Sequence, residues 1–450
     1  MTTDPIVVIG GGVAGLSAAT ALAHAGRKVI VLDARQQLGG RATAFTDRET
    51  GELVDNGQHV LFGCYRATFD FLRRIDAMDN VRVQPSLSVP YIDRSGRRSV
   101  LQCPPLPSPL HLLAGVLDWD AMPWRDRIAV VKLAGPLRRA RRELKRTGRV
   151  TADPNGTVSQ WLAAHGQRPK LRAWLWEPLA VAALNQASDV ASASPFVRVL
   201  AEMFGPDPSA AALVLPTRPL HQTYAEPARQ FIERYGGQVR LNALARVVVE
   251  QNQVRGVEAR GERIAAAVVV STVPWFDLRR LFAGAPPPSL AATVSAATAM
   301  DAMPIVTVNL WYDRPVMDEA FVGLPGRHMQ WAFDKRFVFG SDTSHLSLIS
   351  SSAVTLANMS NDELIALADR EMRESLPGAR SARLTRATAI REKQATFSLA
   401  PGQPSRPDVR TSLDGFYLAG DWIDTGLPGT IESAVISGQR AAEAILGTSR

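Results

Sequence analysis

Apolar runs at the two ends of the chain predict one shared domain. Residues 5–10 (PIVVIG) and 28–33 (KVIVLD) have the continuous apolar character of buried parallel strands, and the Ala- and Leu-rich residues 14–26 between them read as a helix. This spacing predicts a β-α-β unit. A further apolar run at 416–420 (FYLAG) precedes a helical pattern over 430–446. We expect both ends to contribute to one parallel sheet, with the middle of the chain inserted between them.

The middle of the chain mixes helical and strand-like periods. Helical patterns cover 125–147, 157–204, 222–236 and 361–376, and strand patterns cover 238–250, 253–259, 266–273, 304–312 and 344–350. We expect Pro136 to kink the first of these helices and Asn361 to cap the last. A Pro-rich stretch, 104–123, predicts a loop with at most short helices.

Composition adds a strong local charge to this picture. The net charge is +8, and the segment 125–149 accounts for all of it, with ten basic and two acidic residues. The two cysteines, Cys64 and Cys103, form no CxxC motif, which favours a reducing compartment. No basic leader precedes the first strand, and no apolar run reaches about 18 residues, so we expect neither a secretory signal nor a spanning helix.

A glycine motif lies at the first strand-to-helix junction. Gly10, Gly12 and Gly15 form G-x-G-x-x-G, in which the first glycine allows a tight turn, the second allows close approach of a pyrophosphate and the third allows close helix packing. Asp33 ends the next strand, where a carboxylate accepts hydrogen bonds from ribose hydroxyls. Strand, glycines, helix, strand and acid follow in order, which predicts a dinucleotide site.

The motif alone does not distinguish NAD from FAD, but two further segments favour FAD. Gly39-Gly40-Arg41 follows Asp33 closely, where Arg41 can pair with the pyrophosphate. Near the C-terminus, Asp421 follows Gly420 at a strand end, where its carboxylate can accept from ribityl hydroxyls. The helix that begins near 430 can direct backbone N–H groups at the flavin.

These segments define a fold class and a set of cofactor-binding residues. We expect an α/β protein: a Rossmann-type FAD-binding domain, glutathione-reductase-like, built from 1–75, 215–290 and 405–450, with an inserted α+β substrate domain built from 76–214 and 291–404. The predicted cofactor-binding residues are Gly10, Gly12, Val13, Ala14, Gly15, Asp33, Ala34, Arg35, Gly39, Gly40, Arg41, Gly57, Gln58, His59, Ala245, Gly420, Asp421, Thr430 and Ile431. No second G-x-G-x-x-G and no metal-ligand spacing occurs, so we expect no nicotinamide site and no metal.

The glycines, Asp33, Gly39-Gly40-Arg41 and Gly420-Asp421 with Ser437-Gly438 resemble the amine oxidase / phytoene desaturase superfamily of FAD proteins. Four more segments resemble a narrower family, the squalene-associated FAD-dependent desaturases, or hydroxysqualene dehydroxylases. They are 55–61 (DNGQHVL), 176–185 (WEPLAVAALN), 391–397 (REKQATF) and, at the C-terminus, 420–422 (GDW) with 430–434 (TIESA).

The narrower resemblance implies reductive removal of the hydroxyl group of hydroxysqualene to give squalene. His59, Glu177 and Arg391 are the candidate catalytic residues, although a structural role is as plausible for His59 and favoured for the other two. The central region is rich in aromatic side chains, which we expect to pack in the core or to line an apolar tunnel. They are Trp161, Trp174, Trp176, Phe196, Phe204, Phe231, Trp275, Trp311, Tyr312, Trp331, Phe333 and Phe397.

Two rival functions stay open. One is an isoprenoid desaturase or an amine-oxidase-like oxidase, in which hydride moves the opposite way; strand 304–312 lacks the Lys that a classical amine oxidase often keeps beside the flavin. The other is a non-catalytic prenyl-lipid-binding protein, like the GDP-dissociation-inhibitor relatives of this fold, which the intact glycine motif disfavours. The sequence identifies neither the proton donor nor the external electron donor.

A water-insoluble isoprenoid substrate implies collection from a bilayer. We expect the basic segment 125–149 to bind an anionic membrane surface rather than nucleic acid, with a solvated helix as the alternative. The Pro-rich stretch is expected to dip into the bilayer beside it through Leu106, Leu110, Leu112, Leu113, Leu117 and Trp119. The expected location is cytoplasmic, peripherally attached to the inner face of the cytoplasmic membrane.

Overall fold

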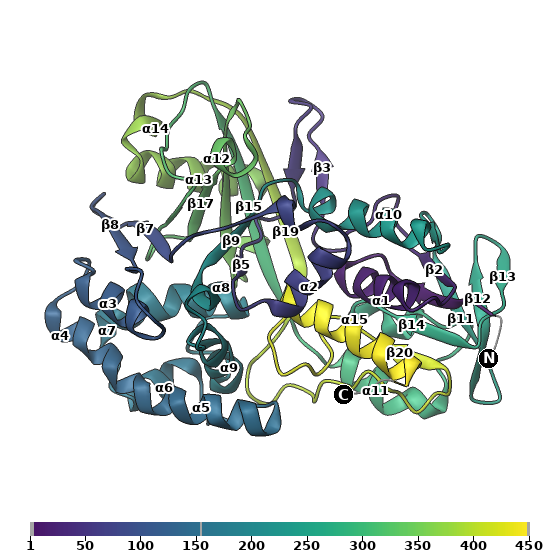
Figure 1. The fold of residues 1–450 in the computed structure, drawn as a ribbon. Helices are drawn as coiled ribbons and strands as arrows, with labels where there is room; N and C mark the ends of the chain where they lie inside the picture. Colours follow the sequence, from purple (N-terminus) through teal and green to yellow (C-terminus); the bar gives the residue numbers. More distant parts are fainter. Residues whose placement is uncertain (1–3, 154, 448–450) are drawn as a thin grey trace.

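The structure is a computed structural model that describes residues 4–153 and 155–447. In Figure 1, a parallel sheet with helices α1 and α15 occupies one side of the molecule, and a larger sheet with helix α13 occupies the other. A group of helices from α3 to α9 lies below the larger sheet. This arrangement confirms the expected α/β class with an additional mixed sheet.

The parallel sheet has the strand order β10-β2-β1-β14-β20. Its strands are β1 (Ile6–Ile9), β2 (Val29–Leu32), β10 (Gln238–Arg240), β14 (Val268–Ser271) and β20 (Phe416–Leu418). Every residue of β1 and β2 is buried, which explains their uninterrupted apolar sequence. The two ends of the chain therefore meet in one sheet, as the apolar pattern predicts.

Helices α1 (Val13–His24) and α15 (Ile431–Leu446) pack directly against each other over this sheet (Figure 1). The Ser17 hydroxyl donates a hydrogen bond to the Val435 carbonyl at 3.0 Å. A Cβ atom at Gly438 would lie 2.3 Å from the Ala14 carbonyl oxygen, so only glycine allows this approach. The contact joins the first and last helices of the chain and brings both helix N-termini to the same edge of the sheet.

The larger sheet has seven strands in the order β19-β15-β18-β17-β16-β7-β8, with one parallel pairing, between β7 and β16. Its strands are β7 (Ser88–Ile92), β8 (Arg98–Gln102), β15 (Ala302–Tyr312), β16 (Phe321–Gly323), β17 (Trp331–Asp334), β18 (Ser344–Ser351) and β19 (Leu384–Phe397). Helix α13 (Asn361–Ser375) packs on β15 and β19 and closes a second hydrophobic core. The expected strands at 304–312 and 344–350 are thus neighbours.

Smaller elements connect the two sheets. The remaining strands are β3 (Ala44–Thr46), β4 (Leu53–Asp55), β5 (Leu61–Phe62), β6 (Val81–Val83), β9 (Leu213–Pro216), β11 (Ala245–Glu250), β12 (Gln253–Ala259) and β13 (Glu262–Ile264). The remaining helices of at least five residues include α2 (Arg66–Arg74), α3 (Leu110–Asp118), α5 (Ala134–Thr147), α6 (Val158–Ala164), α8 (Glu177–Leu184), α9 (Ala193–Met203), α10 (Glu226–Arg234), α11 (Ala291–Thr298), α12 (Lys335–Phe339) and α14 (Pro377–Ser381).

Two local expectations were wrong. Residues 125–147 do not form one kinked helix: α4 (Trp124–Arg127) is followed by the 3₁₀ segment η2 (Ile128–Leu133) and then by α5. Pro136 lies in the first turn of α5, where its missing N–H removes no helical hydrogen bond, so it starts a helix instead of bending one. Helix α13 is capped by Ser360, not Asn361, because Ser360 and Glu363 form a reciprocal capping box.

The parallel sheet draws its strands from the first 32 residues, from 238–271 and from 416–418, whereas the seven-stranded sheet draws from 88–102 and 302–397. The domain boundaries set out above stay a prediction.

Candidate active site

A cavity of about 690 Å³ opens at the carboxyl ends of β1, β2, β14 and β20. Parallel α/β sheets bind ligands at this edge, where neighbouring connections leave in opposite directions. With one exception, every residue predicted to bind the cofactor lines this cavity. The exception is Gly15, whose Cβ would lie 2.0 Å from the Gly10 carbonyl oxygen, so its smallness serves helix packing.

The glycine turn leaves its backbone open to the cavity. Gly10 has φ +108°, a conformation that side chains disfavour, and its carbonyl oxygen accepts from the Thr272 hydroxyl at 2.9 Å. Gly12 precedes α1, and a Cβ there would meet nothing closer than the Gly40 Cα at 3.8 Å. The first turn of α1 holds no acidic residue. The positive end of the helix thus faces a free space, which suits a phosphate.

Asp33 is held rigidly at the end of β2. Its Oδ2 accepts from the Gly11 N–H at 2.6 Å, and its Oδ1 accepts from the Arg35 N–H at 2.8 Å. The side chain is buried, yet it lines the cavity. Each carboxylate oxygen has a second lone pair, so the group can still accept from a ligand hydroxyl.

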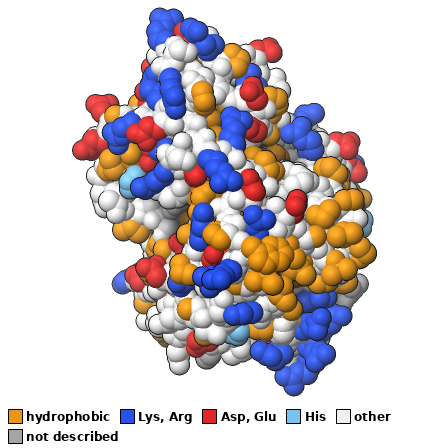
Figure 2. All heavy atoms as spheres, turned by 90° about the vertical axis from the view of Figure 1, so that its left-hand side faces the viewer, with side chains coloured by type: hydrophobic (Ala, Val, Ile, Leu, Met, Phe, Trp, Pro, Cys, Tyr) orange, Lys and Arg blue, Asp and Glu red, His pale blue; other side chains and the backbone are white. Residues whose placement is uncertain are grey.

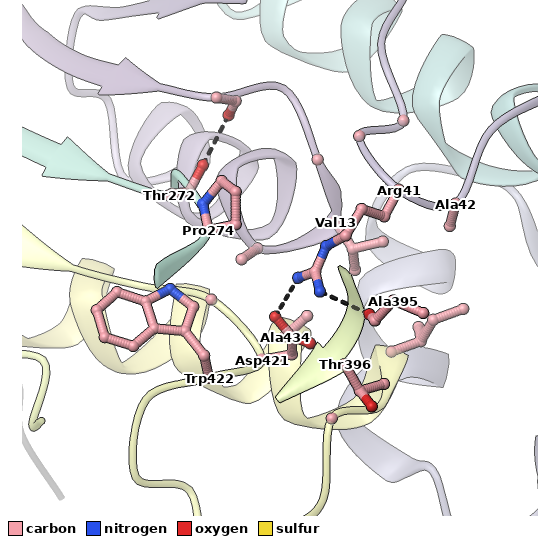
Figure 3. Close-up of a pocket in the computed structure, with 18 of the residues that line it drawn as sticks. Val13, Arg41, Ala42, Thr272, Pro274, Ala395, Thr396, Asp421, Trp422 and Ala434 are labelled. Carbon is pink, nitrogen blue, oxygen red and sulfur yellow. Dashed lines mark hydrogen bonds and ion pairs between the residues drawn. The ribbon is translucent and has the colours of Figure 1, made fainter. Parts of the chain in front are cut away.

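Arg41 and Asp421 form an ion pair across the cavity (Figure 3). Arg41 also donates to the Ala395 carbonyl at 2.7 Å and lies over the Trp275 ring, 5.5 Å from its centroid. The two side chains were predicted separately, one for pyrophosphate and one for the ribityl chain. Their contact joins the start and the end of the chain at one point of the cavity wall.

The N-terminus of α15 also faces the cavity, through Thr430 and Ile431. The Thr430 hydroxyl accepts from the Ser433 N–H at 3.1 Å and caps the helix. Glu432, in the same turn, points away and accepts from the Ala67 and Thr68 N–H groups at 3.0 and 2.8 Å. The Glu432 carboxylate thereby ties α15 to α2 and leaves the cavity side of the helix end without a negative charge.

A buried lysine supports the segment 55–59. The Lys335 ammonium at the start of α12 donates to Gln58 Oε1 at 2.6 Å and lies 3.5 Å from Asp55 Oδ2. Burial lowers the Lys335 pKa, and the Asp55 carboxylate opposes that shift. Gln58 Nε2 in turn donates to the His59 carbonyl at 3.1 Å. Sequence analysis missed Lys335, because its link to this segment crosses about 280 residues.

His59 lines the cavity, and its ring Nδ1 lies 3.1 Å from the Gly57 carbonyl oxygen. Burial lowers the His59 pKa, the Gly57 contact and the Asp55 carboxylate oppose that shift, and the positive charges of Lys335 and Arg41 add to it. A lowered pKa favours the neutral ring, and the Gly57 contact favours the single proton of that form on Nδ1. In this form Nε2 is an acceptor, so the geometry suits His59 for orienting a ligand more than for donating a proton.

The other two candidate catalytic residues lie outside the cavity lining. Glu177 begins α8, and its carboxylate lies 3.4 Å from the Ser188 N–H. Arg391, on β19, donates to Asn361 Oδ1 at 2.6 Å and to the Met359 carbonyl. Both side chains hold neighbouring segments together in this structure, so their proposed part in catalysis gains no support from position.

The twelve aromatic residues of the central region do not line the cavity. Most belong to the core: Trp176 and Phe196 meet edge to face with ring centroids 6.3 Å apart, and Trp311 stacks on His345 at 4.1 Å. The cavity wall instead combines small and aliphatic residues with Tyr65, Phe276 and Trp422. Of the two alternatives, core packing therefore holds for most of these side chains, and none of them lines this cavity.

Several polar residues that line the cavity were not predicted, among them Tyr65, Asn185 and Thr396. Burial raises the pKa of Tyr65, so its hydroxyl keeps its proton across the physiological range. Asn185, at φ +51° after α8, donates to Thr396 Oγ1 at 3.0 Å and accepts from the Ser352 N–H at 2.8 Å. Asn185 and Thr396 lie in segments that carry the narrower family resemblance, which was the available signal. Tyr65 had none.

Within residues 4–153 and 155–447, no group of three or more His, Cys, Asp or Glu side chains is arranged to hold a metal ion.

Comparison with known proteins assigns the family. Residues 13–446 match the family model for flavin-containing amine oxidoreductases, so the chain belongs to that family. A hydroxysqualene dehydroxylase of Sinorhizobium fredii is 29% identical, with 98% of this chain and 97% of the relative covered. A 15-cis-phytoene desaturase of Synechococcus elongatus is 24% identical, with 98% and 95% covered.

Solved structures agree with the fold. An oxidoreductase from Methanosarcina mazei has a TM-score of 0.75 at 17% identity, covering 98% of this chain and all of that one. Wild-type putrescine oxidase bound to putrescine has a TM-score of 0.72 at 18% identity, covering 99% of each chain. The cofactor is FAD, and the open glycine turn, the acid-free start of α1 and the carboxylate at Asp421 fit it.

Proposed function

We propose that FAD lies along the cavity from Asp33 to the N-terminus of α15. Asp33, with Ala34, Arg35 and Ala245 nearby, holds the adenosine end. The backbone at Gly12, Val13 and Gly40 and the Arg41 guanidinium hold the pyrophosphate. The remaining contacts fall to Asp421 for the ribityl chain and to Gly57, Gln58, His59, Thr430 and Ile431 for the flavin ring. The support is that all of these residues line one continuous cavity.

We further propose that the chain removes the hydroxyl group of hydroxysqualene to give squalene. One observation carries this proposal: the four segments that resemble the hydroxysqualene dehydroxylases lie far apart in sequence but converge on the cavity. They contribute, among others, His59, Asn185, Thr396, Trp422 and Ala434 to its wall. Full-length similarity to three hydroxysqualene dehydroxylases, at 25–29% identity, gives further support.

The balance of the reaction defines what the side chains must do. The hydroxyl group takes up one proton and leaves as water, and the carbon that bore it gains a hydride. Reduced FAD (FADH2), when bound, would supply the hydride, which carries both electrons, and its release of one proton would balance the water formed. Tyr65 and His59 both line the cavity, where the Tyr65 hydroxyl can donate a hydrogen bond to the alcohol and His59 Nε2 can accept one. Exclusion of water protects an allylic cation from recapture once the hydroxyl group has left.

The test is a single turnover without oxygen. Holoenzyme photoreduced under anaerobic conditions is mixed with hydroxysqualene, while flavin absorbance and extracted products are followed. We expect the oxidised flavin spectrum to return and about one squalene to form per flavin. A flavin that stays reduced, with hydroxysqualene recovered unchanged, contradicts the proposal.

A carotenoid or isoprenoid desaturase is the second candidate. Full-length similarity to a probable zeta-carotene desaturase and a 15-cis-phytoene desaturase, at 25% and 24% identity, favours it. In that case oxidised holoenzyme would introduce a double bond into an isoprenoid and become reduced. A non-catalytic lipid-binding protein would show neither reaction.

A further inference from the structure

An apolar patch lies on the same side of the molecule as the basic helix α5. Five large hydrophobic side chains between 106 and 131 are at least two-fifths exposed, namely Leu106 (42%), Leu110 (54%), Trp124 (58%), Ile128 (49%) and Val131 (45%). They come from the Pro-rich stretch, α3, α4 and η2, and α3 contacts both α4 and η2. Figure 2 shows hydrophobic side chains gathered on this side, with Lys and Arg beside them. We call these five residues the apolar patch.

The basic residues follow the apolar patch in the chain and lie on the exposed face of α5. The exposed apolar positions 124, 128 and 131 are followed in α5 by exposed basic positions at helical spacing. Leu137 and Ala140 face the protein interior, so the exposed basic face is fixed by packing. This basic face consists of Arg138, Arg139, Arg142, Lys145 and Arg146.

The charge of the basic face is not neutralised by neighbouring carboxylates. In the part of the chain that the structure describes, Arg149 is the one basic residue of 125–149 that makes an ion pair, with Asp424. The two acidic residues of the segment are used elsewhere: Asp126 is buried 3.4 Å from Arg168, and Glu143 accepts from the Thr151 N–H. Asp118, the last residue of α3, is exposed, and Asp120, which follows α3, pairs with Arg97.

We propose that the apolar patch and the basic face together dock on an anionic lipid bilayer. Trp124 and the aliphatic side chains enter the interfacial zone, while the arginines and lysines contact the lipid headgroups. A symmetric contact between this face and the same face of a second copy does not fit, since two such positive faces repel each other at close range. The docking argument rests on exposure and charge alone and holds whichever isoprenoid the cavity accepts.

The structure corrects which residues can enter the bilayer. Leu112 and Trp119, both expected to dip into it, are 6% and 1% exposed and belong to the core. Arg127 donates to the Met122 and Leu117 carbonyls, so it is tied to the protein. Within the described residues, no helix is long and apolar enough to cross a membrane.

The test is co-sedimentation of holoenzyme with phosphatidylcholine vesicles that contain or lack about 30% phosphatidylglycerol, at low and high salt. We expect binding to the anionic vesicles alone, weakened by salt. The basic-face variant Arg138→Gln/Arg139→Gln/Arg142→Gln/Lys145→Gln should bind at least roughly tenfold more weakly. The patch variant Trp124→Ser/Ile128→Ser/Val131→Ser should also lose binding, with FAD content unchanged in both.

Matched controls separate the surface from bulk charge. Lys28→Gln/Arg48→Gln/Arg255→Gln/Arg370→Gln removes the same four charges from exposed positions elsewhere, and Val354→Ser removes a comparably exposed aliphatic side chain. Both controls should bind like the wild type. Any of three results would overturn the proposal. The charge control could lose vesicle binding as much as the basic-face variant does, the wild type could fail to bind anionic vesicles at low salt, or it could bind duplex DNA in place of vesicles.

Discussion

Asp421 and Arg41 neutralise each other at the wall of the cavity, and both side chains come from turns that follow a strand of the parallel sheet. The Asp421 side chain is 8% exposed, so its carboxylate has little competing water. Charge-assisted hydrogen bonds in such a place contribute about 1.5–3 kcal/mol each. We therefore expect a one-atom substitution in this pair to weaken cofactor binding more than a one-atom substitution elsewhere in the cavity.

Asp421→Asn keeps the shape of the side chain but removes the charge. We expect FAD affinity to fall by roughly tenfold to a hundredfold, in line with the loss of one charge-assisted hydrogen bond. Titration of the apoprotein with FAD, followed by flavin fluorescence, gives the Kd. Asp424→Asn is the control, since Asp424 lies on the same loop but pairs with Arg149 outside the cavity. An unchanged Kd in the Asp421 variant would remove this carboxylate from the site.

Lys335 and Asp55 form a buried pair in which each partner compensates the charge of the other. Lys335→Met should lower the free energy of unfolding by about 3–5 kcal/mol, because it leaves the Asp55 carboxylate buried without a cation. Lys335→Met/Asp55→Asn should recover a large part of that loss. Denaturant unfolding of the wild type, Lys335→Met, Asp55→Asn and the double variant measures the coupling between the two residues. If the losses of the two single variants add up in the double variant, the pair is not coupled.

At the scale of elements, the hairpin β3–β4 is attached to the larger sheet by an acid-sensitive contact. Asp47 accepts from Arg386 on β19 at 2.8 Å, and that hydrogen bond lowers the Asp47 pKa to about 2. A carboxyl group with a depressed folded pKa stabilises above its unfolded value and loses that contribution as the pH falls through the folded value. The contact should therefore weaken between about pH 4 and pH 2.

Hydrogen exchange of residues 44–55 measures this weakening. We expect protection of the hairpin to drop as the pH is lowered from about 4 to 2, after correction for intrinsic exchange rates. Asp47→Asn should show the low protection already at pH 5 and little further change. Equal pH dependence in the two proteins would mean that another group holds the hairpin.

The elements also show what a sequence can predict. β1, α1, β2, β20 and α15 were predictable because their apolar runs and glycines report local burial and helix packing directly. The change from the 3₁₀ segment η2 to the α-helix α5 was not predictable from the sequence. Ile128 and Val131 fit the period of a buried helix face, yet both side chains are exposed. Tertiary contacts decide such cases: Lys335 reaches the segment 55–59, and the central aromatics fill the core, through neighbours distant in sequence.

At the scale of the whole molecule, the chain belongs to the flavin-containing amine oxidoreductases, and the proposed docking face on α3 to α5 is separate from the cavity. The chain is similar at full length both to hydroxysqualene dehydroxylases and to carotene desaturases, so the direction of hydride transfer stays open. The cavity wall contains segments that resemble the hydroxysqualene dehydroxylases, and this resemblance favours reduction of the substrate by the flavin.

Oxidised holoenzyme incubated with squalene in air should therefore form no product. We expect squalene to be recovered without a new conjugated double bond, and no hydrogen peroxide above a no-substrate control, because the favoured reaction ends at squalene. Ultraviolet absorbance of the extracted lipid and a peroxide assay measure both. A conjugated product with peroxide would identify an oxidase or desaturase instead.

The most direct test of the central claim is the anaerobic single turnover carried out in deuterium oxide. The N–H groups of reduced flavin exchange with solvent, so a hydride delivered from the cofactor carries deuterium. We expect squalene that contains one deuterium, located at the carbon that bore the hydroxyl group, together with return of the oxidised flavin spectrum. Squalene without deuterium at that carbon, or no squalene while the flavin stays reduced, would contradict it.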